Sequence, residues 1–104
     1  MWNEPEFPQI FGANSLDFLY CVSKYPTPLA DVHLGAVDFS RYAGFSDHTI
    51  GIAASLAAIS LGARIIEKHF TLDKNLYGPD HEGSMTPSEL TALSGFAMEI
   101  AQAL

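Results

Sequence analysis

Side chains that could do chemistry gather at three places in this sequence, each at the end of a segment typical of a β-strand. They are Ser23 and Tyr25, then Ser46, Asp47 and His48, and finally Glu67, Lys68 and His69. Because side chains alternate across a strand, Ser46 and His48 share one face, as do Glu67 and His69. Two imidazoles from adjacent strands can then converge, and neutral imidazole is a common ligand of divalent metals. The placement of His48 and His69 therefore predicts that they bind a catalytic metal ion together. The other coordination positions of the ion would be open to water and substrate oxygens.

Less specific interpretations stay open for the same residues. A histidine taken alone is more often an ordinary hydrogen-bonded side chain near a sheet edge. Glu67 could orient a substrate hydroxyl or accept a proton, or it could be a surface carboxylate paired with Lys68 or Arg64. Alternation turns Lys68 away from Glu67 and His69, which favours a solvent-facing or ion-paired lysine over an imine-forming one. Cys21 lies within an apolar run and is expected to be buried core.

Three strands and three helices are expected to position these groups. The strands are predicted at residues 18–22, 43–48 and 63–70, which are short apolar or β-rich runs. Residues 31–38 allow a short helix. A clearer helix is predicted by the spacing of Ile52, Leu56 and Ile59, and Gly62 follows it where a left-handed cap belongs.

The last helix has the best-defined start. Thr86 and Glu89 form a capping box, and Pro87 occupies the first helical position. One apolar stripe follows along the helix, formed by Leu90, Leu93, Ala97, Ile100 and Leu104. The sequence therefore predicts a helix that packs along one face.

This alternation of strands and helices calls for a parallel sheet with right-handed crossovers and outer helices, the α/β class. Three strand-helix units cannot close a barrel, which needs eight, so the sheet is either small and open or part of a barrel. The connection over residues 71–86 is long for a compact domain and is a candidate functional loop. Residues 77–81 within it could form a lid or substrate contact over the mouth of the site, or only a turn.

Composition narrows the class of protein. The chain has 104 residues, about one domain, with residues 1–17 expected as an irregular lead-in and residues 18–104 as the domain. A formal net charge of −7 makes nucleic acid an unlikely partner. The most apolar stretch, residues 51–66, is shorter than the ~20 residues of a membrane span, and no secretory signal is seen, so a cytoplasmic protein is expected. A single cysteine excludes a disulfide scaffold or a zinc ribbon.

Four segments in order resemble the sialic acid synthase (N-acetylneuraminate synthase) family. They are residues 21–28 (CVSKYPTP), 44–49 (GFSDHT), 62–71 (GARIIEKHFT) and 78–81 (GPDH). The resemblance runs from about residue 18 to the end, and four ordered blocks are more specific than any single motif. It implies the last three strand-helix units of a (β/α)8 TIM barrel. The implied enzyme condenses phosphoenolpyruvate with an N-acetylated aldose such as N-acetylmannosamine, forming a nine-carbon 2-keto acid and releasing phosphate.

The resemblance also implies roles for individual residues. Mn²⁺ or Mg²⁺ would be held by His48 and His69 and would polarise the sugar aldehyde. Catalysis would fall to Glu67 and His69. The implied substrate contacts are Ser46 for phosphoenolpyruvate, Tyr25, Glu67 and Asp80 for the amino sugar, and Ser23, which stands where some members have asparagine.

Members of this family have further strand-helix units, which carry lysines around the phosphate, and a small antifreeze-protein-like domain. Neither part is seen in this sequence. The leading hypothesis is therefore a fragment of a synthase that is inactive alone and needs the missing barrel half or oligomerises. The alternatives are a catalytically silent remnant that acts as a folded or partner-bound module, and a fragment of a related spore-coat polysaccharide or legionaminate-type synthase.

Overall fold

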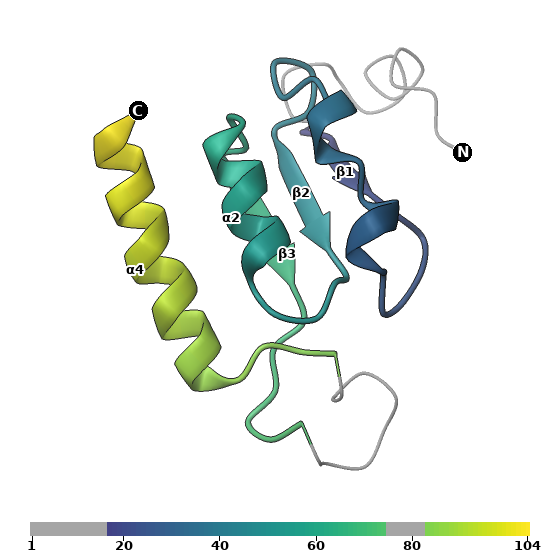
Figure 1. The fold of residues 1–104 in the computed structure, drawn as a ribbon, viewed down its shortest axis with the longest axis vertical. Coiled ribbons are helices and arrows are strands. Elements are labelled where there is room, and N and C mark those ends of the chain that lie inside the picture. Colours follow the sequence, from purple (N-terminus) through teal and green to yellow (C-terminus); the bar gives the residue numbers. More distant parts are fainter. Residues whose placement is uncertain (1–16, 75–82) are drawn as a thin grey trace.

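Three parallel strands form the sheet at the centre of the protein (Figure 1). The computed structural model describes residues 17–74 and 83–104. The strands are β1 (Leu19–Cys21), β2 (Gly44–Asp47) and β3 (Ile65–Lys68), hydrogen-bonded in the order β1-β2-β3. Each lies within a segment predicted as a strand, and the expected parallel pairing of neighbours is confirmed. The register places Ser46 of β2 between Cys21 of β1 and Glu67 of β3.

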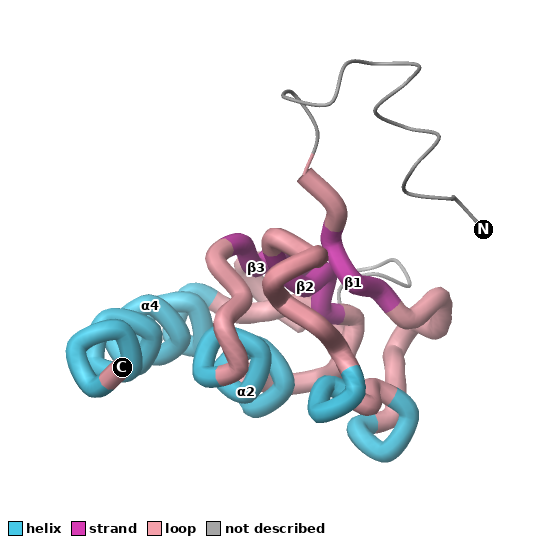
Figure 2. Tube along the Cα trace, turned by 90° about the horizontal axis from the view of Figure 1, so that it is seen from above, coloured by secondary structure: helices cyan, strands magenta, loops and turns pink. Residues whose placement is uncertain are grey.

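The helices lie on one side of this sheet (Figure 2). They are α2 (Ala53–Ser60) and α4 (Pro87–Ala103), and two 3-10 helices, η2 (Leu29–Asp31) and η3 (Leu34–Ala36), precede β2. Within residues 31–38, where one short helix was expected, the structure has only the short 3-10 helix η3, which follows the end of η2. His33 adopts a left-handed conformation with φ 52° between the two turns, so a continuous helix cannot run through it. Neither α2 nor α4, in the described part of the chain, is long and apolar enough to cross a membrane.

The core fills the space between the helices and the sheet. Its buried members are Val32, Phe39, Phe45, Ala54, Ala58 and Ala63. Helix α2 buries Ala54, Ser55 and Ala58, whereas the expected apolar positions Ile52, Leu56 and Ile59 are only half-buried. Small side chains on the buried face let the helix lie close to Phe45 of β2, which hydrophobic spacing alone does not reveal.

Helix α4 begins as the sequence predicts and packs beside α2. The Thr86 hydroxyl accepts a hydrogen bond from the Glu89 backbone N–H at 3.4 Å, and the Glu89 carboxylate accepts one from the Thr86 N–H at 3.1 Å. Leu93 is the one residue of its stripe that is buried among the described residues. Leu90 and Leu104 are exposed, so much of the apolar face of α4 is uncovered in the described structure.

The opposite face of the sheet carries the candidate groups. Tyr20 and Phe45 point to the helix side, where their rings stack with centroids 6.0 Å apart. By alternation, their neighbours Cys21 and Ser46 lie on the other face, which we call the inner face. No described helix covers the inner face (Figure 2).

Candidate active site

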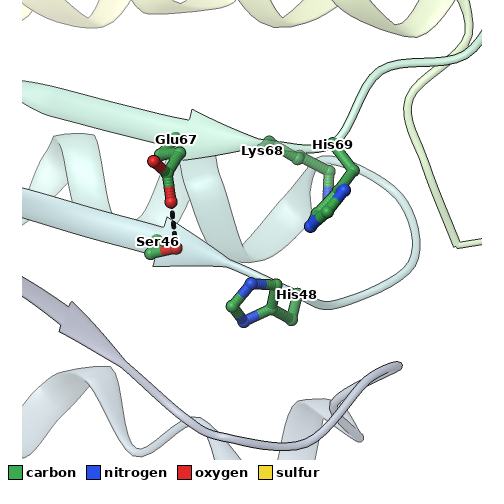
Figure 3. A pocket seen from close by; sticks show the side chains of 5 residues that line it. All are labelled: Ser46, His48, Glu67, Lys68 and His69. Carbon is green, nitrogen blue, oxygen red and sulfur yellow. Dashed lines mark hydrogen bonds between the residues drawn. The ribbon is translucent and has the colours of Figure 1, made fainter. Parts of the chain in front are cut away.

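His48 and His69 come together at the carboxyl ends of β2 and β3. Their ring centroids are 5.7 Å apart with an interplanar angle of 47°. Both line a cavity of about 370 Å³, together with Ser46, Glu67 and Lys68 (Figure 3). The structure therefore brings the two imidazoles together on the inner face, as the alternation argument expected.

The orientation of His48 suits a metal ligand. Its Nδ1 atom lies 3.4 Å from the carbonyl oxygen of Val22. Metal-ligating histidines commonly use one ring nitrogen for a hydrogen bond of this kind and bind the ion through the other. With the proton on Nδ1, the Nε2 lone pair is available to an ion.

The metal-binding side chains that the structure brings together here are two imidazoles, those of His48 and His69. Among the described residues, no group of three or more His, Cys, Asp and Glu side chains could hold a metal ion. Ring centroids 5.7 Å apart are compatible with a shared ion at metal–nitrogen distances of about 2.0–2.1 Å. The residues present therefore fit an ion held by two imidazoles, with the other positions left to water or substrate.

Tyr25 forms a wall beside both histidines. Its ring centroid lies 5.7 Å from that of His48 and 5.1 Å from that of His69, edge-on in each case. The Tyr25–Pro26 peptide bond is cis. The loop after β1 is tied to the end of β2, because the Thr27 N–H donates to the His48 carbonyl at 2.8 Å. The backbone next to Tyr25 is thus tied to the end of β2.

Glu67 and Ser46 form the floor of the cavity. The Ser46 hydroxyl donates to Glu67 Oε1 at 2.7 Å across the β2–β3 register (Figure 3). Glu67 is exposed on the inner face while Ser46 is buried. Of the alternatives considered for Glu67, this contact favours a carboxylate facing the cavity over a surface ion pair.

The long connection leaves and returns beside His69. The Met85 N–H donates to the His69 carbonyl at 2.7 Å, and the Thr71 N–H donates to the Met85 carbonyl at 2.7 Å. The Ser84 hydroxyl lies 3.3 Å from the Tyr25 hydroxyl. Both ends of the predicted functional loop are therefore anchored at the mouth of the cavity.

Of the predicted substrate residues, Ser46 and Glu67 line the cavity, Tyr25 lies beside its two histidines, and Ser23 and Asp80 are not placed at it. Ser23 is exposed in the loop that follows β1. Asp80, with the rest of residues 75–82, lies outside the described residues. Their predicted roles stay predictions.

The expectation that Cys21 is buried core is wrong. Cys21 is exposed on the inner face, with its Sγ atom 3.4 Å from His48 Nδ1. Its apolar neighbours suggested a strand covered on both faces, but no described element covers this one. Partial burial of the sulfur atom raises the pKa of the Cys21 thiol, a hydrogen bond with Ser46 opposes this, and the negative charge of Glu67 adds to it.

Lys68 lies on the helix side of the sheet. It is ion-paired, which was one of the two roles expected for it, and its side chain does not face solvent, which was the other. Its Nζ atom lies 3.4 Å from Asp47 Oδ2, and the two side chains are 2% and 0% exposed. Burial lowers the pKa of Lys68 because it disfavours the charged ammonium, although Asp47 opposes the shift. Sequence reasoning gave Asp47 no role. The available signal was an Asp two residues before a Thr at a strand end, a common turn arrangement.

The sequence of the chain is similar to a family of known proteins and to several of its members. Residues 9–104 match the family model described as the NeuB family, a match that starts within the expected lead-in. The N,N'-diacetyllegionaminic acid synthase of Campylobacter jejuni is 46% identical over an alignment 95 residues long, which covers 86% of this chain and 28% of that protein.

Two solved structures resemble the protein. The N-acetylneuraminic acid (sialic acid) synthetase of Leptospira borgpetersenii, solved with citrate, has a TM-score of 0.74 and 39% identity over 82% of this chain and 32% of its own. The spore coat polysaccharide biosynthesis protein SpsE of Bacillus subtilis has a TM-score of 0.79 and 36% identity over 90% of this chain and 28% of its own. The chain spans about a third or less of these relatives. With 96 of its 104 residues matched by the family model, the chain belongs to the NeuB family.

Proposed function

We propose that this chain is part of a synthase that condenses phosphoenolpyruvate with an N-acetylated amino sugar, forming a nine-carbon 2-keto acid and releasing phosphate. The observation that carries the proposal is the shared cavity of His48, His69 and Glu67 in a member of the NeuB family. Similarity to the sialic acid synthetase of Leptospira supports the reaction class. A legionaminate-type or spore-coat polysaccharide product fits the same site.

Mn²⁺ or Mg²⁺ would be held by His48 and His69. When bound, the ion would polarise the aldehyde carbonyl of the open-chain sugar as a Lewis acid. The fixed ring of Tyr25 restricts how far either imidazole can turn, which keeps both aimed at the cavity. Tyr25 and Asp80 would also contact the amino sugar, with Ser23 close to it.

Glu67 and Ser46 would act on the substrates directly. Ser46 contacts phosphoenolpyruvate, and its hydroxyl is held in one direction by the bond to Glu67. Water adds to the enol carbon that becomes C2 of the product, and this water must lose a proton. Glu67 is the carboxylate that lines the cavity in the described structure, so it takes that proton or orients a sugar hydroxyl.

The three strands are, in this proposal, the last three units of a (β/α)8 barrel in the cytoplasm. An uncovered inner face, outer helices and polar groups at the carboxyl ends of the strands all agree with that architecture. Phosphate and carboxylate recognition needs convergent cations. The chain has five Lys and Arg residues, and Lys68 is buried behind the sheet. The chain alone therefore lacks much of the phosphate site.

A chimera tests the function. Residues 18–104 replace the matching segment of the Leptospira sialic acid synthetase, and phosphate release from phosphoenolpyruvate is measured with N-acetylmannosamine and Mn²⁺. We expect activity that His48→Ala and His69→Ala each abolish, whereas His33→Ala, a change at an exposed histidine outside the cavity, leaves it intact. A folded but inactive chimera would refute the proposal and favour a catalytically silent module.

A further inference from the structure

A buried ion pair lies directly behind the two histidines. Asp47 and Lys68 are register partners in β2 and β3, and each is the residue immediately before one of the histidines. Alternation puts the pair on the helix side and the imidazoles on the inner face. One cross-link between the two strands thus lies one residue away from both candidate ligands.

The Lys68 ammonium contacts the chain on both sides of His48. It lies 3.4 Å from Asp47 Oδ2 and donates to the Thr49 carbonyl oxygen at 2.5 Å. Asp47 and Thr49 are the residues before and after His48. Movement of His48 relative to β3 would therefore break contacts of a buried charge.

Asp47 closes the network from its own side. Its Oδ1 accepts bonds from the Thr49 N–H at 2.8 Å and the Thr49 hydroxyl at 2.6 Å. Its Oδ2 accepts a bond from the Ser55 hydroxyl of α2 at 2.5 Å. Thr49 and Ser55 are both fully buried. The turn that carries His48 is thereby fixed to both β3 and α2.

Stability alone is a weak reason for such a pair. Desolvation of two charges is costly, and a buried ion pair can often be replaced by neutral residues of similar volume with little loss of stability. Its specific contribution is geometric. We propose that Asp47 and Lys68 are positioning residues, a clamp that sets the spacing of His48 and His69. The consequence for metal binding rests on the proposed function, whereas the clamp itself does not.

The test compares a neutral double variant, Asp47→Asn with Lys68→Met, against a matched control, Lys24→Met with Asp31→Asn. The control removes an ion pair of 2.8 Å whose side chains are 62% and 39% exposed. Circular dichroism and urea unfolding establish that each variant folds. The first readout needs no metal. It is the set of nuclear Overhauser contacts between the imidazole protons of His48 and His69, measured on protein labelled at its histidines. The second is the Mn²⁺ dissociation constant.

We expect the double variant to fold but to lose the contacts between the imidazoles. Its Mn²⁺ affinity should fall about 10-fold or more, which is the loss typical when a residue that supports a metal ligand is replaced. The control should keep both the imidazole contacts and the Mn²⁺ affinity. The single variant Lys68→Arg, which retains the charge, should also keep the imidazole contacts. If the double variant loses the imidazole contacts while the wild-type chain binds no Mn²⁺, the clamp is supported and the metal proposal is refuted. Unchanged contacts in the folded double variant would overturn the clamp. If neither this variant nor Asp47→Asn with Lys68→Gln folds, the pair is a folding determinant and the positioning role is also overturned.

Discussion

At the residue scale, the inner face combines an imidazole pair with a carboxylate and a thiol. Glu67 faces the cavity and accepts a bond from Ser46, while the Cys21 sulfur lies beside His48. The carboxylate charge and the partly buried sulfur disfavour a thiolate at this position. Cys21 is therefore expected to stay a neutral thiol, and its sulfur atom contacts the Nδ1 side of the His48 ring.

Thiol reactivity tests this electrostatic arrangement. Because the thiolate is the reacting form and the pKa of Cys21 is raised, folded chain should react with iodoacetamide at pH 8 more slowly than urea-unfolded chain. Glu67→Gln should speed the reaction of the folded chain, since it removes the repelling charge. Alkylation rates measured by mass spectrometry across pH check both. A folded chain whose reactivity rises at lower pH than that of the unfolded chain would contradict the arrangement.

The side chains that share the inner face could be predicted from the sequence, because the alternation of side chains depends only on the strand that carries them. His48 and His69 needed only the strand ends to be placed correctly. The burial of Lys68 and the exposure of Cys21 depend on what covers each face of the sheet. That information lies in tertiary packing, so the apolar run around Cys21 suggested the wrong environment.

At the element scale, β2 is the strand on which the site depends. Gly44 starts it, and a Cβ atom there would overlap the carbonyl oxygen of Ile65 in β3. Glycine is therefore required for the two strands to lie close enough to pair. The same pairing sets the distance between His48 and His69.

Gly44→Ala should weaken the β2–β3 pairing. We expect a loss of about 1–3 kcal/mol in the free energy of unfolding, the usual cost of overpacking, measured by urea denaturation. Gly95→Ala is the matched control, because an added Cβ in α4 meets nothing within 4 Å there. It should stabilise the helix by up to about 1 kcal/mol. Equal effects of the two substitutions would argue against the close approach.

The capping box of α4 offers a second test at this scale. Thr86→Ala removes the hydroxyl that accepts the Glu89 N–H and should cost about 1 kcal/mol. Thr91→Ala, within the same helix and on its exposed side, should have a smaller effect on the urea midpoint. A Thr86→Ala protein as stable as the wild type would show that the cap contributes nothing.

Elements with a local signal were predictable, and the others were not. The capping box and Pro87 determine the start of α4, and apolar runs mark the strands. The 3-10 turns around His33 are too short to show a period, so residues 31–38 were expected as one helix. The packed face of α2 was missed because alanine spacing carries little hydrophobic signal.

At the scale of the whole molecule, no described helix lies on the inner face of the sheet, and β1 and β3 each pair on one side only within the described sheet. The exposed side chains include Ile65 on the inner face, 40% exposed, and Leu90, Phe96 and Met98 on α4. Open strand edges and apolar patches promote association between chains. In the proposed barrel, neighbouring strand-helix units would cover these surfaces.

The isolated chain should therefore oligomerise or aggregate. Multi-angle light scattering over a range of concentrations should show masses above the 11.3 kDa monomer that rise with concentration. Sequence reasoning reached this expectation from the number of strands. A monomer at every concentration would contradict it.

The isolated chain should also release no phosphate. Incubation with Mn²⁺, N-acetylmannosamine and phosphoenolpyruvate should give no more phosphate than a His48→Ala control, because the chain supplies few of the cations that the proposed reaction needs around a phosphate. Metal-dependent release that the control loses would show that an assembled oligomer completes the site.

Manganese binding tests the histidine pair most directly. Titration of the full chain with Mn²⁺, followed by the electron paramagnetic resonance signal of the free ion, should show a site that His48→Ala and His69→Ala each weaken at least about 10-fold, since each would remove one of the two proposed protein ligands. His33→Ala, at an exposed histidine outside the cavity, should bind as the wild type does. Binding that survives both substitutions, or falls equally with His33→Ala, would contradict the account.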